Sequence, residues 1–133
     1  MAEYHAAWGE GRFRVAASAL CCGADWVVAV TGGTLPHVGA VSLAVYEPAR
    51  DSATVSTMTV YTHRDDLLSQ RGAKMLARAL CAAVSMSVGI HLDEADPAEL
   101  TVLARNFDRC CALLLEAIRK ELPPACRPAH ANA

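Results

Sequence analysis

The sequence predicts an α+β fold, a single layered domain in which two amphipathic helices pack on a mostly antiparallel sheet in the order ββββαβα. Three observations support this prediction. Four short apolar segments, separated by turn residues, precede residue 62 and alternate as strands do. Two later segments carry the apolar period of helices, and a fifth strand-like segment lies between them. The early hairpins favour antiparallel pairing.

Length and composition fit one domain with one core. The chain has 133 residues, of which 53% are hydrophobic and 20% charged, as is typical of a globular protein. We expect a domain over residues 1–122 with its core at about 11–121, followed by a disordered tail at 123–133. The formal net charge of −2 argues against a nucleic-acid interface and against a basic membrane-binding patch.

Neither a membrane span nor a signal peptide is legible in the sequence. No apolar run reaches the roughly 20 residues that a span requires, and the first residues lack a basic and then apolar layout. We therefore expect a cytoplasmic protein. Because no Cys-x-x-Cys occurs, we interpret the cysteines as small buried side chains. They are Cys21, Cys22, Cys81, Cys110, Cys111 and Cys126.

Each expected strand has a recognisable pattern. The continuous apolar run at 26–30 predicts a central strand buried on both faces, and residues 1–10 are expected to be an irregular lead-in. The strands are expected at 12–22, 26–30, 40–46, 54–61 and 85–93. In the third, Val41, Leu43 and Val45 share one face. In the last, the faces are Met86, Val88, Ile90 and Leu92 against Ser85, Ser87, Gly89 and His91.

The two helices show start signals and apolar stripes. We expect the first to begin with Thr62 as N-cap and the second at Asp96-Pro97. Gly72 is costly in a helix and therefore indicates close packing on the sheet. The stripes are Leu68, Gly72, Met75, Leu76 and Ala79 in the first, and Leu100, Leu103, Phe107, Cys111, Leu114 and Ile118 in the second.

Polar and glycine residues follow the expected strands at three places. The first is "TGGTLPHVG", where Gly32 and Gly33 expose backbone N–H groups near His37. No Walker lysine or GxGxxG pattern accompanies them. A hairpin loop with a surface histidine therefore explains this stretch as well as a ligand-binding loop does.

The second place is "YTHRDD", where a strand becomes a helix. The start of a helix favours anions, and Thr62, His63 and Arg64 would lie there, with Arg64 able to clamp a phosphate. Asp65 and Asp66 are expected to satisfy the helix dipole themselves.

The third place is "GIHLDEADP". Gly89, His91 and Asp93 share one face, whose small residues would let another group approach. Together, His37, His63 and His91 could hold a divalent metal or hydrogen-bond a polar cofactor. No nucleophile motif is legible.

These three stretches, in this order, resemble blocks of a known family. "TGGTLPHVGAVSLA", "YTHRDDLLSQRGAKMLARAL" and "VGIHLDEADPAEL" are similar to the LpdD-like D-subunit family associated with hydroxyarylic acid and gallate decarboxylases, also called the prenylated-flavin chaperone-like family. The similarity runs from about Trp26 to Leu115. It implies a protein that binds prenylated FMN (or FMN) and stores, delivers or helps to mature it, without being the decarboxylase itself.

The resemblance also implies a site and transient contact with a decarboxylase or flavin prenyltransferase. A homodimer is expected because the long apolar second helix could pack against another copy, and a divalent metal bridging the phosphate is a further candidate. The matching cofactor positions are Gly32, Gly33, His37, Gly39, Thr62, His63, Arg64, Gly89, His91 and Asp93. Two alternatives stay open: a small metal- or flavin-dependent enzyme that uses His37, His63 and His91, and a ligand-free structural subunit of a decarboxylase complex.

Overall fold

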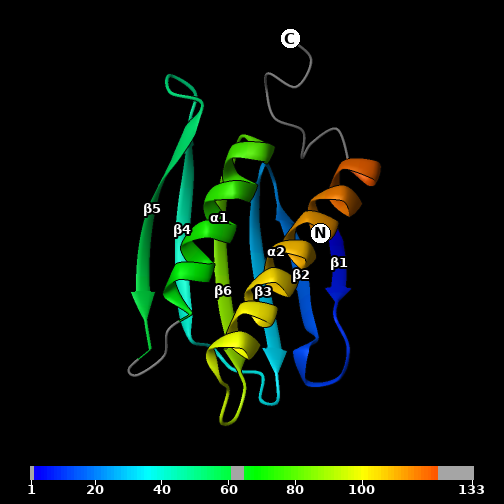
Figure 1. Cartoon of the computed structure of the whole chain (residues 1–133). Helices are drawn as coiled ribbons and strands as arrows, with labels where there is room; N and C mark the ends of the chain where they lie inside the picture. Colours follow the sequence, from blue (N-terminus) through cyan, green and yellow to red (C-terminus); the bar gives the residue numbers. More distant parts are fainter. Residues whose placement is uncertain (1, 61–64, 123–133) are drawn as a thin grey trace.

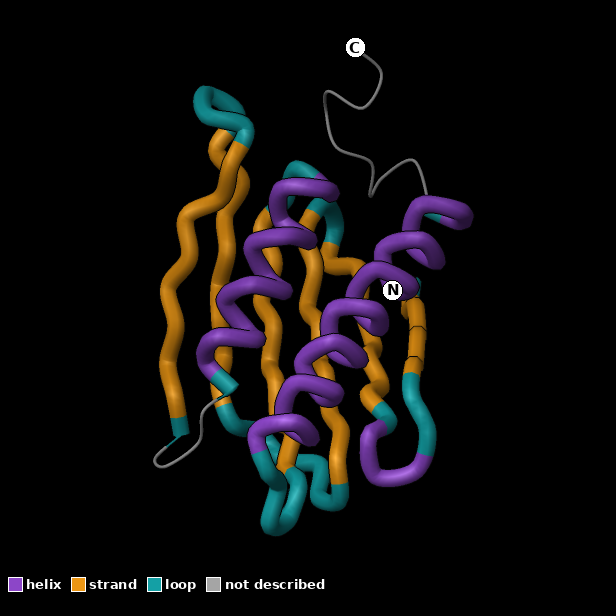
Figure 2. The backbone as a smooth tube through the Cα atoms, viewed as in Figure 1, coloured by secondary structure: helices purple, strands orange, loops and turns teal. Residues whose placement is uncertain are grey.

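A six-stranded sheet carries both long helices on one face in the computed structural model, which describes residues 2–60 and 65–122 (Figure 1). The strands are β1 (Glu3–Trp8), β2 (Val15–Cys22), β3 (Asp25–Gly33), β4 (Ala40–Glu47), β5 (Ser52–Thr59) and β6 (Ala83–His91). The helices are η1 (Gly11–Phe13), α1 (Asp66–Leu80) and α2 (Pro97–Glu121). The predicted α+β class is confirmed, and Figure 2 shows its two layers.

The strand order is β1-β2-β3-β6-β4-β5. Only β3 and β6 pair in parallel, and the remaining neighbours are antiparallel, so the sheet is mostly antiparallel as predicted. In this order β6 enters between β3 and β4. Its last residue, His91, therefore lies beside Gly33 at the end of β3, while Ala40 at the start of β4 lies beside Val88.

Strand β1 was missed by the sequence prediction, which treated residues 1–10 as a lead-in. The segment pairs with β2 along its whole length. The sequence of this strand shows little apolar alternation, because Tyr4 is its one buried residue. The Tyr4 ring packs edge-on against Trp26 with centroids 5.7 Å apart, and its hydroxyl donates to the carbonyl of Glu121 at 3.0 Å. Long-range contacts of this kind leave no local pattern.

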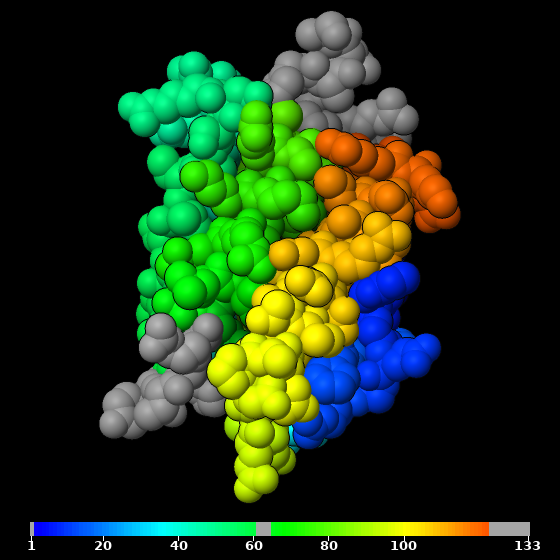
Figure 3. Space-filling view, in the orientation of Figure 1, coloured from blue at the N-terminus to red at the C-terminus, as the bar shows by residue number. Residues whose placement is uncertain are grey.

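The prediction that residues 26–30 are buried on both faces was wrong. Trp26, Val28 and Val30 are buried, but Val27 is 46% exposed, because it points away from the face that the two helices cover. That helix-covered face is the one seen in Figure 3. The side chains of Val41, Leu43 and Val45 do share a face, as predicted, and that face is the uncovered one. In β4 it is the small residues Ala40, Ser42 and Ala44 that lie beneath the helices.

The predicted core of the helical layer is mostly confirmed. Phe107 and Leu76 are fully buried, whereas Leu100, which we placed on the same stripe, is 54% exposed. A Cβ on Gly72 would lie 2.7 Å from the sulfur of Met86 and 2.8 Å from the ring of Phe107, which confirms close packing at this glycine. Further buried positions on the second stripe are Leu103, Cys111, Leu114 and Ile118.

The helix starts differ in their capping. Asp96 accepts from the backbone N–H of Glu99 at 2.8 Å and Glu99 accepts from that of Asp96 at 3.2 Å, which is a full capping box at the predicted place. Helix α1 starts after Asp65, and Thr62 lies outside the described residues. Within residues 2–60 and 65–122, neither helix has the length and apolar content needed to cross a membrane.

Burial of the cysteines is uneven. Cys110 and Cys111 are buried as expected, but Cys22 is exposed on the uncovered face of the sheet. The expectation that every cysteine is a buried apolar residue was therefore wrong for Cys22, for the half-buried Cys81 and for Cys21, which is disulfide-bonded.

Candidate functional site

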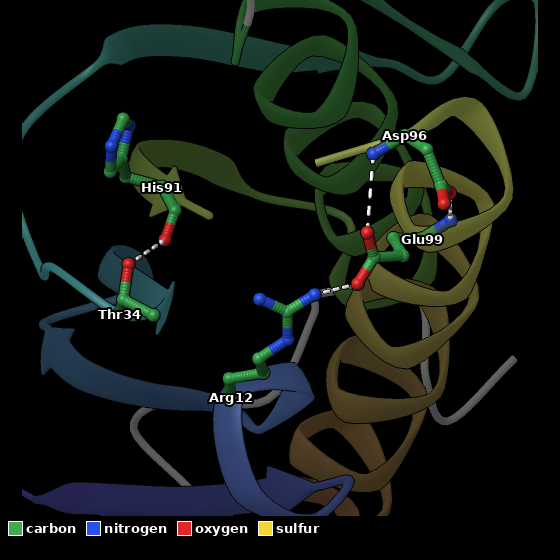
Figure 4. A network of polar contacts seen from close by, with 5 residues as sticks. All are labelled: Arg12, Thr34, His91, Asp96 and Glu99. Atoms are coloured by element: carbon green, nitrogen blue, oxygen red, sulfur yellow. Dashed lines mark hydrogen bonds and ion pairs between the residues drawn. The ribbon is translucent and has the colours of Figure 1, made fainter. Parts of the chain in front are cut away.

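Three segments far apart in sequence meet at one end of the sheet: the β3–β4 connection, the start of α1 and the end of β6 (Figure 1). Thr34 donates to the carbonyl of His91 through its backbone N–H at 2.7 Å and its hydroxyl at 3.2 Å, the latter shown in Figure 4. Gly39 donates to the carbonyl of Val88 at 2.9 Å. The connection is thus tied to β6 on both of its sides.

Two predicted glycines, Gly89 and Gly33, lie where backbone segments touch. A Cβ on Gly89 would overlap the carbonyl of His37, and one on Gly33 would overlap that of His91. Gly33 also has a φ of +79°, which favours glycine. The group that approaches these glycines most closely is therefore the backbone of this same chain. Their absent side chains bring the β3–β4 connection onto the end of β6.

A buried histidine–aspartate pair lies at the centre of this end. The Nε2 atom of His37 is 3.4 Å from Oδ2 of Asp65, and the two side chains are 17% and 7% exposed. The other carboxylate oxygen of Asp65 accepts from the backbone N–H of Ile90 at 3.2 Å. A Cβ on Gly39 would overlap the Asp65 carboxylate, so that glycine makes room for it.

Asp65 was expected to serve the helix dipole, and this expectation was wrong in its main point. Asp65 is the N-cap residue of α1, but its side chain makes no capping hydrogen bond. The carboxylate instead reaches away from the helix to the end of β6 and to His37. It occupies the gap where β4 and β6 separate, and so joins the helix to the sheet.

A second histidine–aspartate pair lies alongside. Nε2 of His91 is 2.8 Å from Oδ1 of Asp93, with the two side chains 40% and 75% exposed. The rings of His37 and His91 meet edge to face, with centroids 6.1 Å apart. Among residues 2–60 and 65–122, no group of three or more His, Cys, Asp or Glu side chains is placed to hold a metal. His63, the remaining member of the predicted metal cluster, lies outside the described residues.

A cavity of about 460 Å³ opens beside these pairs, between α1, α2 and the end of β6. Its polar groups are Asp65, His91 and Arg71. Arg71 is held by Asp108, whose Oδ1 accepts from Nε at 2.9 Å and lies 2.8 Å from Nη2. The rest of the lining is apolar, comprising Leu67, Leu68, Ile90, Leu92, Leu100, Leu103 and Ala104.

The structure brings most of the predicted site residues together. Gly33, His37, Gly39, Gly89, His91 and Asp93 lie at the end of the sheet just described. Gly32 belongs to β3, where a Cβ would lie 2.9 Å from the carbonyl of Arg14. Thr62, His63 and Arg64 lie outside the described residues.

Sequence reasoning missed two side chains of the site, Asp65 as the partner of His37 and Arg71 in the cavity lining. It also assigned Leu100 to the core. One signal was available for the cavity: Leu67, 61% exposed, is a large apolar residue off the predicted stripe of α1. No local signal identified Asp65, because its partners are 28 residues earlier and 25 residues later in the chain.

The layered fold is similar to that of a protein of known structure. One chain of a solved chaperone complex for yeast 20S proteasome assembly matches with a TM-score of 0.60 and 13% sequence identity, over 92% of this chain and 100% of that chain. At this identity the likeness concerns the fold alone.

Sequence comparison is more specific. Residues 9–119 match the family described as prenylated flavin chaperone LpdD-like domain. Protein LpdD of Lactiplantibacillus plantarum is 29% identical over 86 residues, which are 65% of this chain and 63% of that protein. The aligned part thus spans somewhat less than two thirds of that relative. The chain belongs to the prenylated flavin chaperone LpdD-like family, as its three sequence blocks implied.

Proposed function

We propose that this protein binds prenylated FMN at the sheet end formed by His37, Asp65 and His91, and keeps it for a decarboxylase that uses it. Membership of the prenylated flavin chaperone family is the observation that carries the proposal. The geometry supports it by placing a cavity against the polar cluster that the sequence predicted.

The cavity suits the ring system of a flavin. A volume of about 460 Å³ lies within the range of roughly 300–1,000 Å³ that cofactor pockets occupy. Leucine and isoleucine side chains would cover the apolar part of the ring. Asp65 can accept hydrogen bonds, and His91 can donate or accept, so together they match the mixed N–H and carbonyl edge of a flavin.

The phosphate needs a cation, and among residues 2–60 and 65–122 Arg71 is the cation that lines the cavity. Its guanidinium already contacts Asp108, at a place where both side chains are about half exposed. A phosphate would therefore compete with Asp108 or share Arg71 with it. Asp65 and Asp66 make the start of α1 less attractive to an anion than a neutral helix start. For this reason we keep Arg64 in the proposed site as a second cation.

The bound flavin supplies the redox chemistry, and this chain's residues hold and shield it. The half-exposed imidazole of His91 is open to a ligand, and its Nε2 lies beside Asp93. The more buried His37 is fixed by Asp65 and by a contact of Nδ1 with the carbonyl of Leu35 at 3.1 Å. We assign His37 to positioning and His91 to cofactor contact. A cytoplasmic homodimer that transiently contacts a decarboxylase or flavin prenyltransferase completes the proposal.

The test is anaerobic co-expression with a flavin prenyltransferase, followed by absorbance and mass spectrometry of the purified protein. We expect prenylated FMN to co-purify in a near-stoichiometric amount. A flavin-free protein that still co-purifies with a decarboxylase would contradict the proposal and favour a structural subunit.

A further inference from the structure

Within residues 2–60 and 65–122, no helix packs on the second face of the sheet, and the β3–β4 connection touches that face only at its end, at Gly89. The helices pack on the side of Trp26, Val28 and Val30, and the opposite side chains are exposed or half-buried. On that side the larger apolar residues reach 80% exposure at Met58 and 49% at Leu43. The others in this group are Val27, Val41 and Val45, each 38–46% exposed.

Charged and ionisable side chains on this face lie only at its margins, within the described residues. Glu3 and His5 lie on the edge strand β1, and Asp25, Glu47 and His91 lie at strand ends. The area between them carries only apolar, serine, threonine and glycine side chains. An uncharged centre inside a polar rim is the composition of a protein–protein interface.

The surface of this area has a self-complementary shape, because a row of larger side chains runs beside a row of small ones. Strand β4 presents Val41, Leu43 and Val45 as a raised apolar row. The neighbouring β6 presents the small residues Ser87, Ser85 and Ala83, which lie directly opposite this β4 row in the register. A ridge and a groove of equal length thus run side by side along two adjacent strands.

We propose that a second copy of this chain packs on this face, sheet against sheet, with the β4 ridge of each copy in the β6 groove of the other. A two-fold axis parallel to the strands and midway between β4 and β6 produces this match. An axis perpendicular to the strands would set ridge against ridge. The axis parallel to the strands also sets β3 of one copy opposite β5 of the other. Met58 on β5 then packs over the exposed side chains of β3, and the charged edge strand β1 lies outside the contact.

The area is sufficient for a stable dimer. Four strands about 4.8 Å apart and eight residues of about 3.3 Å each give roughly 500 Å² per copy. The pair would then bury about 1,000 Å², which reaches the size expected of a specific interface.

This packing specifies how the two copies in the homodimer of the proposed function contact each other. It also has a consequence for the cofactor site. Rotation about an axis parallel to the strands leaves both copies pointing the same way, so the two His91 side chains lie at the same end of the dimer. Because β6 is next to the axis, both sites flank it. The exposed side chains of Leu35 and Val38, 59% and 56% exposed, would extend the contact beside each site.

Sedimentation velocity of the full chain without flavin tests this inference independently of cofactor binding. We expect wild type to be a dimer at tens of micromolar and Val41→Asp to raise its dissociation constant at least tenfold, because the charge would be buried in an apolar contact. Val102→Asp is the matched control, since Val102 is 39% exposed on α2 and Val41 38% on β4. That control should leave the dimer unchanged.

A second variant tests the same contact in case Val41→Asp does not fold. The double change Val41→Thr and Leu43→Thr places β-branched side chains, which suit a strand, at both positions, and it should also weaken the dimer while circular dichroism stays unchanged. A monomeric wild type, or a dimer lost in Val102→Asp but kept in both β4 variants, would overturn the proposal. Either result would leave the flavin test unaffected.

Discussion

The Asp65 carboxylate lies 3.4 Å from Nε2 of His37 and accepts a 3.2 Å hydrogen bond from the backbone of Ile90. One buried side chain thereby joins the start of α1, the β3–β4 connection and the end of β6. The arrangement accounts for Gly39, where a side chain would overlap the carboxylate.

Asp65→Ala should destabilise the fold by about 1–3 kcal/mol, because the partly buried N–H of Ile90 loses its acceptor and the His37 ring loses the carboxylate beside it. Asp65→Asn should cost less, since its amide oxygen can still accept from Ile90. Denaturant unfolding measures both. The control is Asp66→Ala, because within the described residues Oδ1 of Asp66 is buried without a hydrogen-bond partner. Equal stability of Asp65→Ala and wild type would contradict the assigned role.

Gly33→Ala should be more destabilising than Gly23→Ala. Both glycines have positive φ, at +79° and +65°, so the backbone strain of about 1–2 kcal/mol is common to the two changes. Only at Gly33 would the new methyl group overlap another segment, the carbonyl of His91. The difference between their unfolding free energies isolates that collision. Similar losses in the two variants would mean that the β3–β4 connection is not held closely against β6.

Much of this fold could be predicted from local patterns, since strand alternation and the Asp96–Glu99 capping box each depend on residues that are close in sequence. Burial on a particular face could not, because it depends on where both helices pack. That dependence explains the error at Val27 and the assignment of Leu100 to the core. At the site, the strand-end positions of His37 and His91 were predictable. The role of Asp65 was not, because its partners come from distant segments.

Asp96→Ala should lower stability by about 1 kcal/mol through loss of the capping box of α2. Arg12→Ala should cost less, roughly 0–1 kcal/mol, because its ion pair with the outer oxygen of Glu99 is partly exposed (Figure 4). Thermal unfolding of the two variants provides the comparison. A larger loss for Arg12→Ala would show that η1 depends on this pair more than α2 depends on its cap.

The two buried thiols of α2 should resist alkylation in the native protein. Burial raises the pKa of Cys110 to about 11 and that of Cys111 to about 12, from 9.0. At pH 8 both are protonated, whereas the exposed Cys22 should react first with iodoacetamide. Peptide mass spectrometry reads out the order. Early labelling of Cys110 or Cys111 in folded protein would contradict their burial.

The same pKa shifts predict a pH dependence of stability. Because both folded pKa values lie above that of an unfolded thiol, their contribution is complete below about pH 9. It is lost as the pH rises through 11 to 12, when the unfolded chain ionises first. Denaturant midpoints between pH 8 and 10.5 should therefore fall for wild type. They should fall less for the double variant Cys110→Ala and Cys111→Ala, and parallel slopes would contradict this origin.

The central claim, that the end of the sheet at His91 holds prenylated FMN, is tested most directly by anaerobic titration of the flavin-free protein with the reduced cofactor. The account predicts saturable binding in wild type and at least a tenfold weaker Kd in His91→Ala. His5→Ala, which changes an exposed histidine on the edge strand β1, should bind as wild type does. Equal affinity of all three proteins, or loss of binding only in His5→Ala, would contradict it.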